Sequence, residues 1–192
     1  MIHVVGDSHQ FIFKEEDGFR INDFYSPVTA YRLIDMDDSD LRGGTLISLV
    51  SKRIPDSDML VVSAGEIDCR IHMFNAHKKH GKPLLDVVKD TIDMFIKFLK
   101  SLDRKNLAVL GIPPAGDQGN SYNAEFYPTP EEQAGVYKMF HEETKKRCEL
   151  EHVKYVDMYS ETVENGHMKK EYKGDDVHLN KKAVQIARRQ LS

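Results

Sequence analysis

The sequence predicts an α/β protein in which helices cover both faces of a parallel sheet. Strand-like and helix-like segments alternate from end to end, which is typical of such folds. The apolar runs at residues 2–5, 59–63 and 107–112 are each followed within two residues by glycine or proline, as expected of buried parallel strands. A chain of 192 residues is long enough for one substantial core and short for two, so we expect one domain over residues 1–192.

The first part of the chain is predicted to alternate between strands and a short helix. A strand at residues 2–5 comes first, and residues 28–34 are a second candidate strand with a weaker pattern. A helix is expected at residues 46–52, entered through Gly43-Gly44-Thr45. The continuous apolar run at residues 59–63 then predicts a buried strand.

The clearest helix follows Pro83. Its apolar residues recur three and four positions apart, with Asp and Lys between them: Leu84, Leu85, Val88, Ile92, Phe95, Ile96 and Leu99. A strand at residues 107–112 comes next and ends at Pro113-Pro114. The polar loop that continues to Pro128 is longer than a connection requires, and such loops often belong to a functional site.

The last part of the chain predicts a helix, a strand and a final helix. Thr129, Pro130 and Glu132 have the pattern of a capping box with proline in the first turn. Residues 152–157 are predicted to be the last strand. Asn180 is expected to cap the final helix.

The strongest candidate for chemistry is Ser8, in the turn Gly6-Asp7-Ser8 directly after the first strand. This turn is expected at the carboxyl edge of the sheet, where α/β folds place their sites. A serine hydroxyl becomes a nucleophile only when a base takes its proton. His178 is the candidate base, and Asp175, three residues before it, can hold Nδ1 of the ring and leave Nε2 facing Ser8. Taken alone, Gly-Asp-Ser is also an ordinary turn sequence with a capping serine.

Four blocks of the sequence together resemble the SGNH (GDSL-like) hydrolases: residues 6–8, 43–45, 65–68 and 175–180, in this order. The resemblance covers almost the whole chain. It implies a three-layer α/β/α, flavodoxin-like fold and esterase, lipase or carbohydrate deacetylase chemistry without a metal or cofactor. The family's nucleophile falls on Ser8, its base on His178 and its orienting acid on Asp175.

The resemblance also implies an oxyanion hole, and here the sequence departs from the family. The first donor falls on the backbone N–H of Ser8 and the second on that of Gly43 or Gly44. The third donor is usually an asparagine side chain, but Ile67 stands in its place and cannot donate a hydrogen bond. In a known protease, loss of one such donor lowers turnover by about 10²–10³-fold.

Several polar residues near these blocks are candidates for substrate binding: Asp7, His9, Glu66 and Arg70. Arg70 is the first candidate to replace the missing donor, because its guanidinium carries a charge and several N–H groups. Alternatively, Arg70 pairs with Glu66 or Asp68 and stiffens the loop. His9 either lines the pocket or points into solvent. Tyr122, Phe126 and Tyr127 either stack on a sugar or pin their loop to the core.

Composition excludes several classes of function. The net charge of -4 and the scattered Lys and Arg residues give no surface for nucleic acid. Two cysteines, Cys69 and Cys148, do not form a disulfide framework. A metal site at His72, His77 and His80 is not expected, because Cys69 is the one thiolate or acidic residue nearby with suitable spacing. No apolar run is long enough for a membrane, and no secretory signal is visible, so a cytoplasmic location is expected.

The sequence therefore predicts a serine hydrolase that cleaves an ester, with an acyl group on a carbohydrate as the expected substrate. Two other functions stay open. The same acyl-enzyme can pass its group to a sugar hydroxyl, which would make the protein a transferase. Alternatively, the cleft binds a saccharide or a protein without catalysis; Ile67 favours this reading, and the intact Ser8, Asp175 and His178 oppose it.

Overall fold

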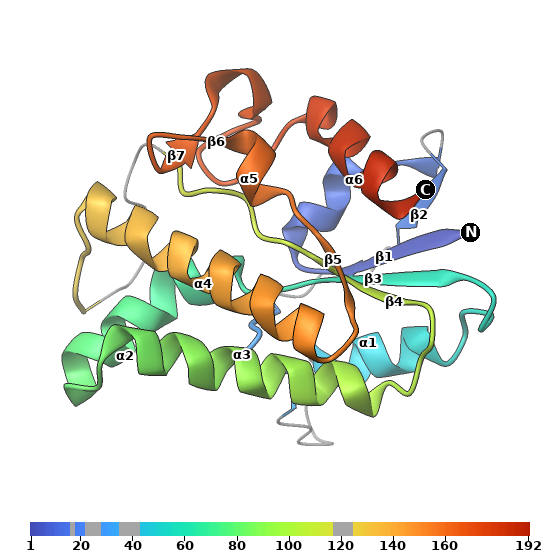
Figure 1. Ribbon diagram of the computed structural model, residues 1–192, viewed down its shortest axis with the longest axis horizontal. Coiled ribbons are helices and arrows are strands. Elements are labelled where there is room, and N and C mark those ends of the chain that lie inside the picture. Colours follow the sequence, from blue (N-terminus) through green and yellow to red (C-terminus); the bar gives the residue numbers. More distant parts are fainter. Residues whose placement is uncertain (16–17, 22–27, 35–42, 117–124) are drawn as a thin grey trace.

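A computed structural model describes residues 1–15, 18–21, 28–34, 43–116 and 125–192. Its centre is a five-stranded sheet in the order β2-β1-β3-β4-β5 (Figure 1). All neighbouring strands run parallel, so the predicted fold class is confirmed. The strands are β1 (Ile2–Gly6), β2 (Phe19–Ile21), β3 (Met59–Ser63), β4 (Leu107–Leu110) and β5 (Lys154–Val156).

Helices lie on both faces of this sheet, which gives three layers (Figure 1). The α-helices are α1 (Gly44–Ser51), α2 (Met73–His80), α3 (Leu84–Ser101), α4 (Pro130–Leu150), α5 (Tyr159–Thr162) and α6 (Val184–Leu191). A π-helix, η3 (Asp68–His72), leads into α2. The 3₁₀ turns within the described residues are η1 (Ser8–Ile12), η4 (Lys170–Tyr172) and η5 (Lys181–Ala183). A small antiparallel hairpin consists of β6 (Val163–Glu164) and β7 (His167–Met168).

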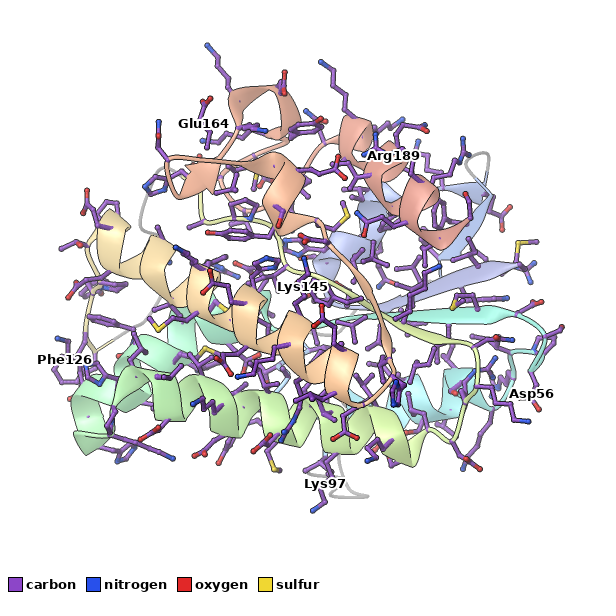
Figure 2. All side chains as sticks on the ribbon, viewed as in Figure 1. Asp56, Lys97, Phe126, Lys145, Glu164 and Arg189 are labelled. Atoms are coloured by element: carbon purple, nitrogen blue, oxygen red, sulfur yellow. The ribbon has the colours of Figure 1, made fainter. Side chains whose placement is uncertain are left out.

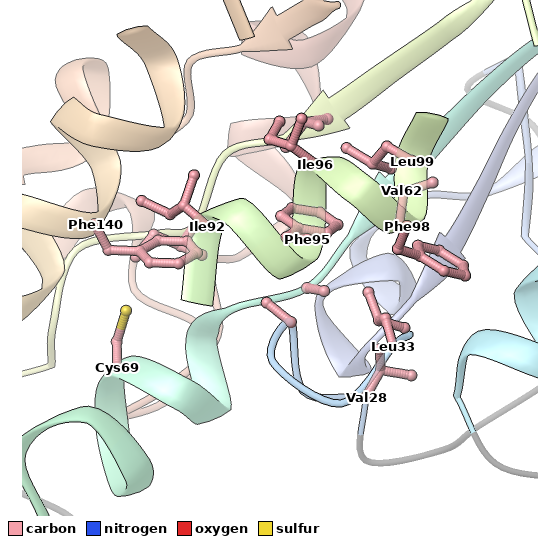
Figure 3. Close-up of a cluster of buried hydrophobic side chains, with 14 of the residues drawn as sticks. Val28, Leu33, Val62, Cys69, Ile92, Phe95, Ile96, Phe98, Leu99 and Phe140 are labelled. Atoms are coloured by element: carbon pink, nitrogen blue, oxygen red, sulfur yellow. The ribbon is translucent and has the colours of Figure 1, made fainter. Parts of the chain in front are cut away.

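Two hydrophobic clusters hold the layers together, because successive strand residues point to opposite faces. Val5, Val62 and Val109 belong to the cluster with α3 and α4, which includes the fully buried Phe95 and Phe98 (Figure 3). Their neighbours Val4, Val61 and Ala108 belong to the second cluster, with α6. Charged residues such as Lys97 and Glu164 project outward (Figure 2). The strands are thus buried on both faces, as their continuous apolar runs predict.

The predicted helices match the structure closely. Thr129 accepts a hydrogen bond from the Glu132 N–H, and Glu132 accepts one from the Thr129 N–H, so the capping box is confirmed. The helix predicted at residues 46–52 begins two residues earlier, at Gly44. Asn180 caps the final helical segment, which starts with η5 and continues as α6.

The strand predicted at residues 28–34 is wrong: this segment is a turn. The buried carboxylate of Asp68 accepts hydrogen bonds from the backbone N–H groups of Ala30 (2.6 Å) and Tyr31 (3.4 Å), which a sheet would otherwise use. Val28, Ala30 and Leu33 are buried in the cluster with α3, so the apolar residues serve packing rather than a sheet. The strand beside β1 is the shorter β2.

The burial of Asp68 gives the first testable prediction. Burial raises the pKa of this carboxyl from 3.8 to about 7, despite the two hydrogen bonds that it accepts. Between these pH values the folded state holds a proton that the unfolded state has lost, so Asp68 weakens the fold as pH rises. We expect Asp68→Asn, which cannot ionise, to gain stability relative to the parent protein between about pH 4 and pH 7, by at most about 1.4 kcal/mol per pH unit.

Urea unfolding at pH 4.5 and pH 7.5 measures this difference. Asp56→Asn is the matched control, because the side chain of Asp56 is fully exposed. A difference between Asp68→Asn and the parent that stays constant with pH would contradict the prediction.

Candidate active site

Ser8 stands in a turn at the carboxyl end of β1, next to β3. Gly6, the last residue of β1, has φ of +139°, and a Cβ atom there would lie 1.8 Å from the carbonyl oxygen of Ser63. Only glycine therefore allows the chain to turn at this point. The Asp7 N–H donates to the same carbonyl (3.0 Å), and Asp7 caps η1, which Ser8 begins. Ser8 thus lies at the point where the strand order reverses, the usual site of doubly wound sheets.

Asp175 and His178 lie in a tight loop between η4 and η5. Two backbone N–H groups, those of Gly174 (2.8 Å) and Asp175 (3.2 Å), donate to the carbonyl of His178 and close the loop. Oδ1 of Asp175 accepts hydrogen bonds from the N–H groups of Val177 and His178, both at 2.7 Å. The spacing of three residues therefore allows one carboxylate to organise both the backbone and the ring of His178.

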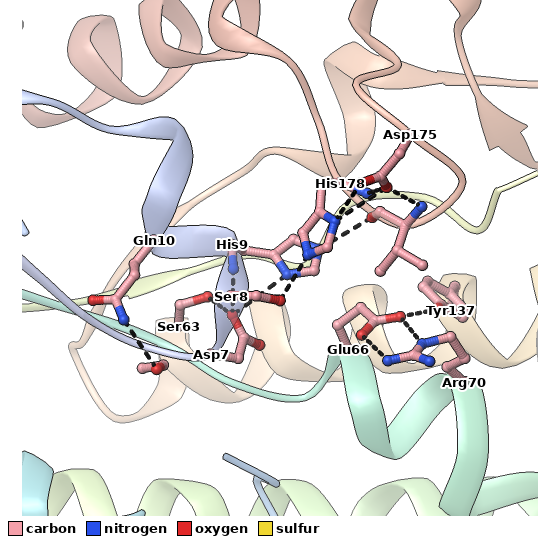
Figure 4. Close-up of polar contacts among 12 residues, drawn as sticks. Asp7, Ser8, His9, Gln10, Ser63, Glu66, Arg70, Tyr137, Asp175 and His178 are labelled. Atoms are coloured by element: carbon pink, nitrogen blue, oxygen red, sulfur yellow. Dashed lines mark hydrogen bonds and ion pairs between the residues drawn. The ribbon is translucent and has the colours of Figure 1, made fainter. Parts of the chain in front are cut away.

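The structure brings the three predicted residues together in one chain of contacts (Figure 4). Oγ of Ser8 is 2.7 Å from Nε2 of His178, and Nδ1 of His178 is 2.9 Å from Oδ2 of Asp175. Partial burial opposes ionisation of Asp175, but the N–H groups of Val177 and His178 and the imidazole outweigh it. They lower the pKa of Asp175 from 3.8 to about 2. The order and distances of these contacts are those that a nucleophile, a base and an orienting carboxylate require.

Asp7 and His9, two of the residues predicted to bind substrate, are both buried beside Ser8. Asp7 accepts hydrogen bonds from the Ser63 hydroxyl (2.7 Å) and the His9 N–H (3.1 Å). Nε2 of His9 is 3.2 Å from the carbonyl oxygen of Val177. The His9 ring is therefore buried and bound to the backbone, and it does not point into solvent.

Glu66 and Arg70 form a separate buried cluster with Tyr137 of α4 (Figure 4). Nε of Arg70 donates to Oε1 of Glu66 at 2.7 Å, and Nη2 donates to Oε2 at 3.3 Å. The Tyr137 hydroxyl donates to Oε1 of Glu66 at 2.6 Å. These contacts match the alternative in which Arg70 pairs with Glu66 and stiffens the loop. Asp68 instead accepts a hydrogen bond from the backbone of the 28–34 turn.

The predicted oxyanion donors lie at two helix starts. Among the described residues, none accepts a hydrogen bond from the N–H of Ser8. Gly43 caps α1 with φ of +52°, and a Cβ on Gly44 would lie 1.8 Å from the carbonyl oxygen of Leu33. In the part of the chain that the structure describes, no hydrogen bond joins either glycine to Ser8 or His178. Ile67 is partly buried and directly precedes the π-helix.

A cavity of about 720 Å³ lies between the 28–34 turn, the π-helix with α2, and α3. Asp68, Ile71 and His72 of the π-helix line it, and so does Arg32 of the 28–34 turn. Ser8, Asp175 and His178 do not line it. The cavity is thus separate from the contact chain described above.

The remaining candidates take no part in the contacts among Ser8, His178 and Asp175 that the structure describes. Within the described ranges no group of three His, Cys, Asp or Glu side chains is arranged to hold a metal. Cys69 and Cys148 are buried free thiols. Phe126 is pinned to α2, because its N–H donates to Oδ1 of Asn75, whereas Tyr127 is exposed. Tyr122 lies outside the described residues. No helix among the described residues is long and apolar enough to span a membrane.

The family model for GDSL-like lipases and acylhydrolases matches residues 16–191. The chain belongs to this family. Asp175 and His178 lie within the matched range, whereas the GDSL-like turn with Ser8 lies before it. A search of curated proteins by sequence finds no match.

Solved structures of a GDSL-like lipase and of two esterases share the fold at low identity. A GDSL-like lipase from Bacteroides thetaiotaomicron has a TM-score of 0.57 at 15% identity, covering 99% of this chain and 84% of that one. A carbohydrate acetylesterase from Sinorhizobium meliloti has a TM-score of 0.59 at 12% identity, with 99% and 95% covered. An aryl esterase from M. smegmatis has a TM-score of 0.57 at 13% identity, with 97% and 93% covered. The three-layer α/β/α fold that the resemblance implies is thereby confirmed.

Proposed function

We propose that the protein is a serine esterase that removes small acyl groups, with acetyl esters of carbohydrates as its substrates. The contact of 2.7 Å between Oγ of Ser8 and Nε2 of His178 is the observation that carries the proposal. Membership of an acylhydrolase family supports the class of reaction. The carbohydrate acetylesterase among the structural neighbours supports the substrate class by analogy.

In the proposed reaction, Ser8 attacks the acyl carbonyl while His178 takes its proton. Asp175 stabilises the imidazolium and fixes its orientation. The alcohol leaves with the proton that His178 returns, and the acyl group stays on Oγ of Ser8. Water then attacks this ester with His178 again as base, which releases the acid and regenerates the serine.

The negative oxygen of the tetrahedral intermediate requires donors. We assign to this role the N–H of Ser8, which has no acceptor among the described residues, together with an N–H of Gly43 or Gly44 at the start of α1. Ile67 supplies none, and the contacts of Arg70 with Glu66 argue against Arg70 as a substitute. The proposal therefore has two donors, and we expect slower turnover than in relatives with three.

Replacement of Asp175 tests the role of the orienting carboxylate. We expect Asp175→Asn to lower kcat on p-nitrophenyl acetate by about 10⁴-fold, because an amide does not hold the imidazole in the required tautomer. Because the pKa of Asp175 is about 2, protonation of this residue does not limit activity above about pH 3. Asp176→Asn, one residue away, is the control, since Asp176 pairs with Lys173 instead. Equal rates for the two variants would contradict the role of Asp175.

Pre-steady-state kinetics separate this proposal from a binding domain. An esterase with an acyl-enzyme gives a burst of p-nitrophenol that matches the enzyme concentration when deacylation is slow. Addition of a sugar acceptor that accelerates product release without forming acetate would favour the transferase instead. The complete absence of turnover would favour a binding domain, for which Ile67 is the one supporting residue.

A further inference from the structure

His9, the residue after Ser8, is held between two oxygen atoms. Its Nε2 is 3.2 Å from the carbonyl oxygen of Val177, and its Nδ1 is 3.4 Å from Oδ1 of Asp7. The side chain is 5% exposed, so water does not compete for either nitrogen. Figure 4 shows the ring of His9 beside that of His178, and the two ring centres are 5.0 Å apart.

The two oxygen atoms determine where His9 carries hydrogen. A backbone carbonyl only accepts hydrogen bonds, so Nε2 must be protonated. Asp7 is kept ionised by the donors on its other sides, the Ser63 hydroxyl and the His9 N–H. Nδ1 makes no hydrogen bond among the described residues, but it lies within ion-pair distance of this carboxylate, which favours a proton on Nδ1 as well. The geometry thus describes a buried imidazolium paired with a carboxylate.

The titration of the two groups agrees with this pairing. Burial lowers the pKa of His9, but the charge and hydrogen bond of Asp7, with smaller contributions from Glu66 and the Val177 carbonyl, together outweigh it, and the net shift is upward. Burial raises the pKa of Asp7, but His9 outweighs it and the net shift is downward. His178 is the other ring that faces His9, and its Nδ1 contacts Asp175, whereas Glu66 is paired with Arg70.

The carbonyl that His9 binds belongs to the loop of the base. Val177 lies between Asp175 and His178, and its N–H donates to Oδ1 of Asp175 at 2.7 Å. One side of this residue is therefore fixed by the orienting acid and the other by His9. Because the Val177 carbonyl is part of the peptide bond to His178, its position determines where the imidazole of His178 lies relative to Ser8.

We propose that His9, paired with Asp7, is a positioning residue that attaches the loop of Asp175 and His178 to the turn of Ser8. This inference rests on the proposed roles of Ser8 and His178. It assigns to Asp7 of the Gly-Asp-Ser turn the role of counter-ion rather than of substrate ligand. One short helical turn then carries both the nucleophile and the group that places its base.

Variants of His9 test this role by kinetics. We expect His9→Phe, which keeps a ring but has no donor, to lower kcat on p-nitrophenyl acetate by about 10²-fold with little change in KM, the effect of a displaced catalytic group. His9→Gln can donate from its amide to Val177 and should recover part of this loss. His77→Phe is the matched control, because Nδ1 of His77 also contacts a backbone carbonyl, that of Lys82 at 2.7 Å, outside the site.

The outcomes distinguish failure of the proposed function from failure of the role of His9. If Ser8→Ala retains the activity of the parent protein, the proposed function fails and the role of His9 fails with it. If Ser8→Ala is inactive but His9→Phe matches His77→Phe, the role of His9 alone is refuted. A kcat of His9→Gln no higher than that of His9→Phe would likewise exclude positioning through the Val177 carbonyl.

A measurement of ring protonation tests the pairing without any substrate. In ¹⁵N NMR spectra at pH 7, we expect both ring nitrogens of His9 to carry hydrogen, and Asp7→Asn to remove the hydrogen from Nδ1. The assignment of the His9 signals comes from comparison with His9→Gln. Neutral His9 in the parent protein at pH 7, or an unchanged signal in Asp7→Asn, would overturn the inference.

Discussion

Ser8→Ala is expected to lower the kcat for p-nitrophenyl acetate by about 10⁶-fold, to a rate that binding and oxyanion donors alone can support. The Ser8 hydroxyl is the atom that would form the acyl-enzyme, and no other group can take its place in the reaction. Its one described side-chain contact is with His178, so the fold should be retained. Steady-state kinetics with the purified variant measure the loss, and thermal unfolding measures the fold.

Ser160→Ala is the matched control for this experiment. Ser160 is exposed and its Oγ lies 3.4 Å from Nε2 of a second histidine, His141. However, the Ser160 hydroxyl donates to Asp157 at 2.9 Å, and Nδ1 of His141 is 2.9 Å from the Tyr155 hydroxyl and 3.9 Å from Oδ1 of Asp157. Asp157 thus accepts a hydrogen bond from the serine itself and makes none with Nδ1 of His141, so the control should keep full activity. A larger loss of kcat in Ser160→Ala than in Ser8→Ala would contradict the assignment of Ser8 as the nucleophile.

Gly6→Ala is expected to have the largest effect on stability. The added Cβ would lie 1.8 Å from the carbonyl oxygen of Ser63, and φ of +139° strains any residue with a side chain. Since Ser63 belongs to the central strand β3, neither side can move without disturbing the sheet. We expect a loss of more than about 4 kcal/mol in unfolding free energy, or a Tm lower by about 10 °C.

Gly135→Ala provides the comparison at a permissive position. Gly135 lies within α4, and a Cβ there would meet nothing within 4 Å. Alanine should stabilise this helix by about 0.5–1 kcal/mol. Scanning calorimetry measures the Tm of both variants. A Tm for Gly6→Ala equal to that of the parent would contradict the close approach of Gly6 to the Ser63 carbonyl.

The sequence predicted the elements whose signal is local. The three apolar strands, the amphipathic α3 and the capping box of α4 each depend on neighbouring residues, and all were placed correctly. The family match and the fold also agree with the resemblance read from four short blocks. The contacts among Ser8, His178 and Asp175 agree in geometry with the pattern, and their catalytic role remains a prediction.

The errors came from contacts between distant parts of the chain. The 28–34 turn resembles a strand, but Asp68, 38 residues beyond Ala30, takes its backbone donors. Asp7 accepts a hydrogen bond from Ser63, and Glu66 accepts one from Tyr137. Both donors come from other elements, and no spacing in the sequence predicts these pairs. The hairpin of β6 and β7 was detectable, because its loop is Asn165-Gly166, the usual sequence of a tight hairpin turn.

The central claim is that Ser8 is an activated nucleophile, and covalent labelling tests it most directly. A fluorophosphonate reacts with a serine only when a base activates its hydroxyl. Digestion and mass spectrometry of the labelled protein should place one adduct on Ser8, with labelling lost in His178→Ala and unchanged in Ser160→Ala. An adduct on another residue, or no adduct on folded protein over a broad pH range, would contradict the account.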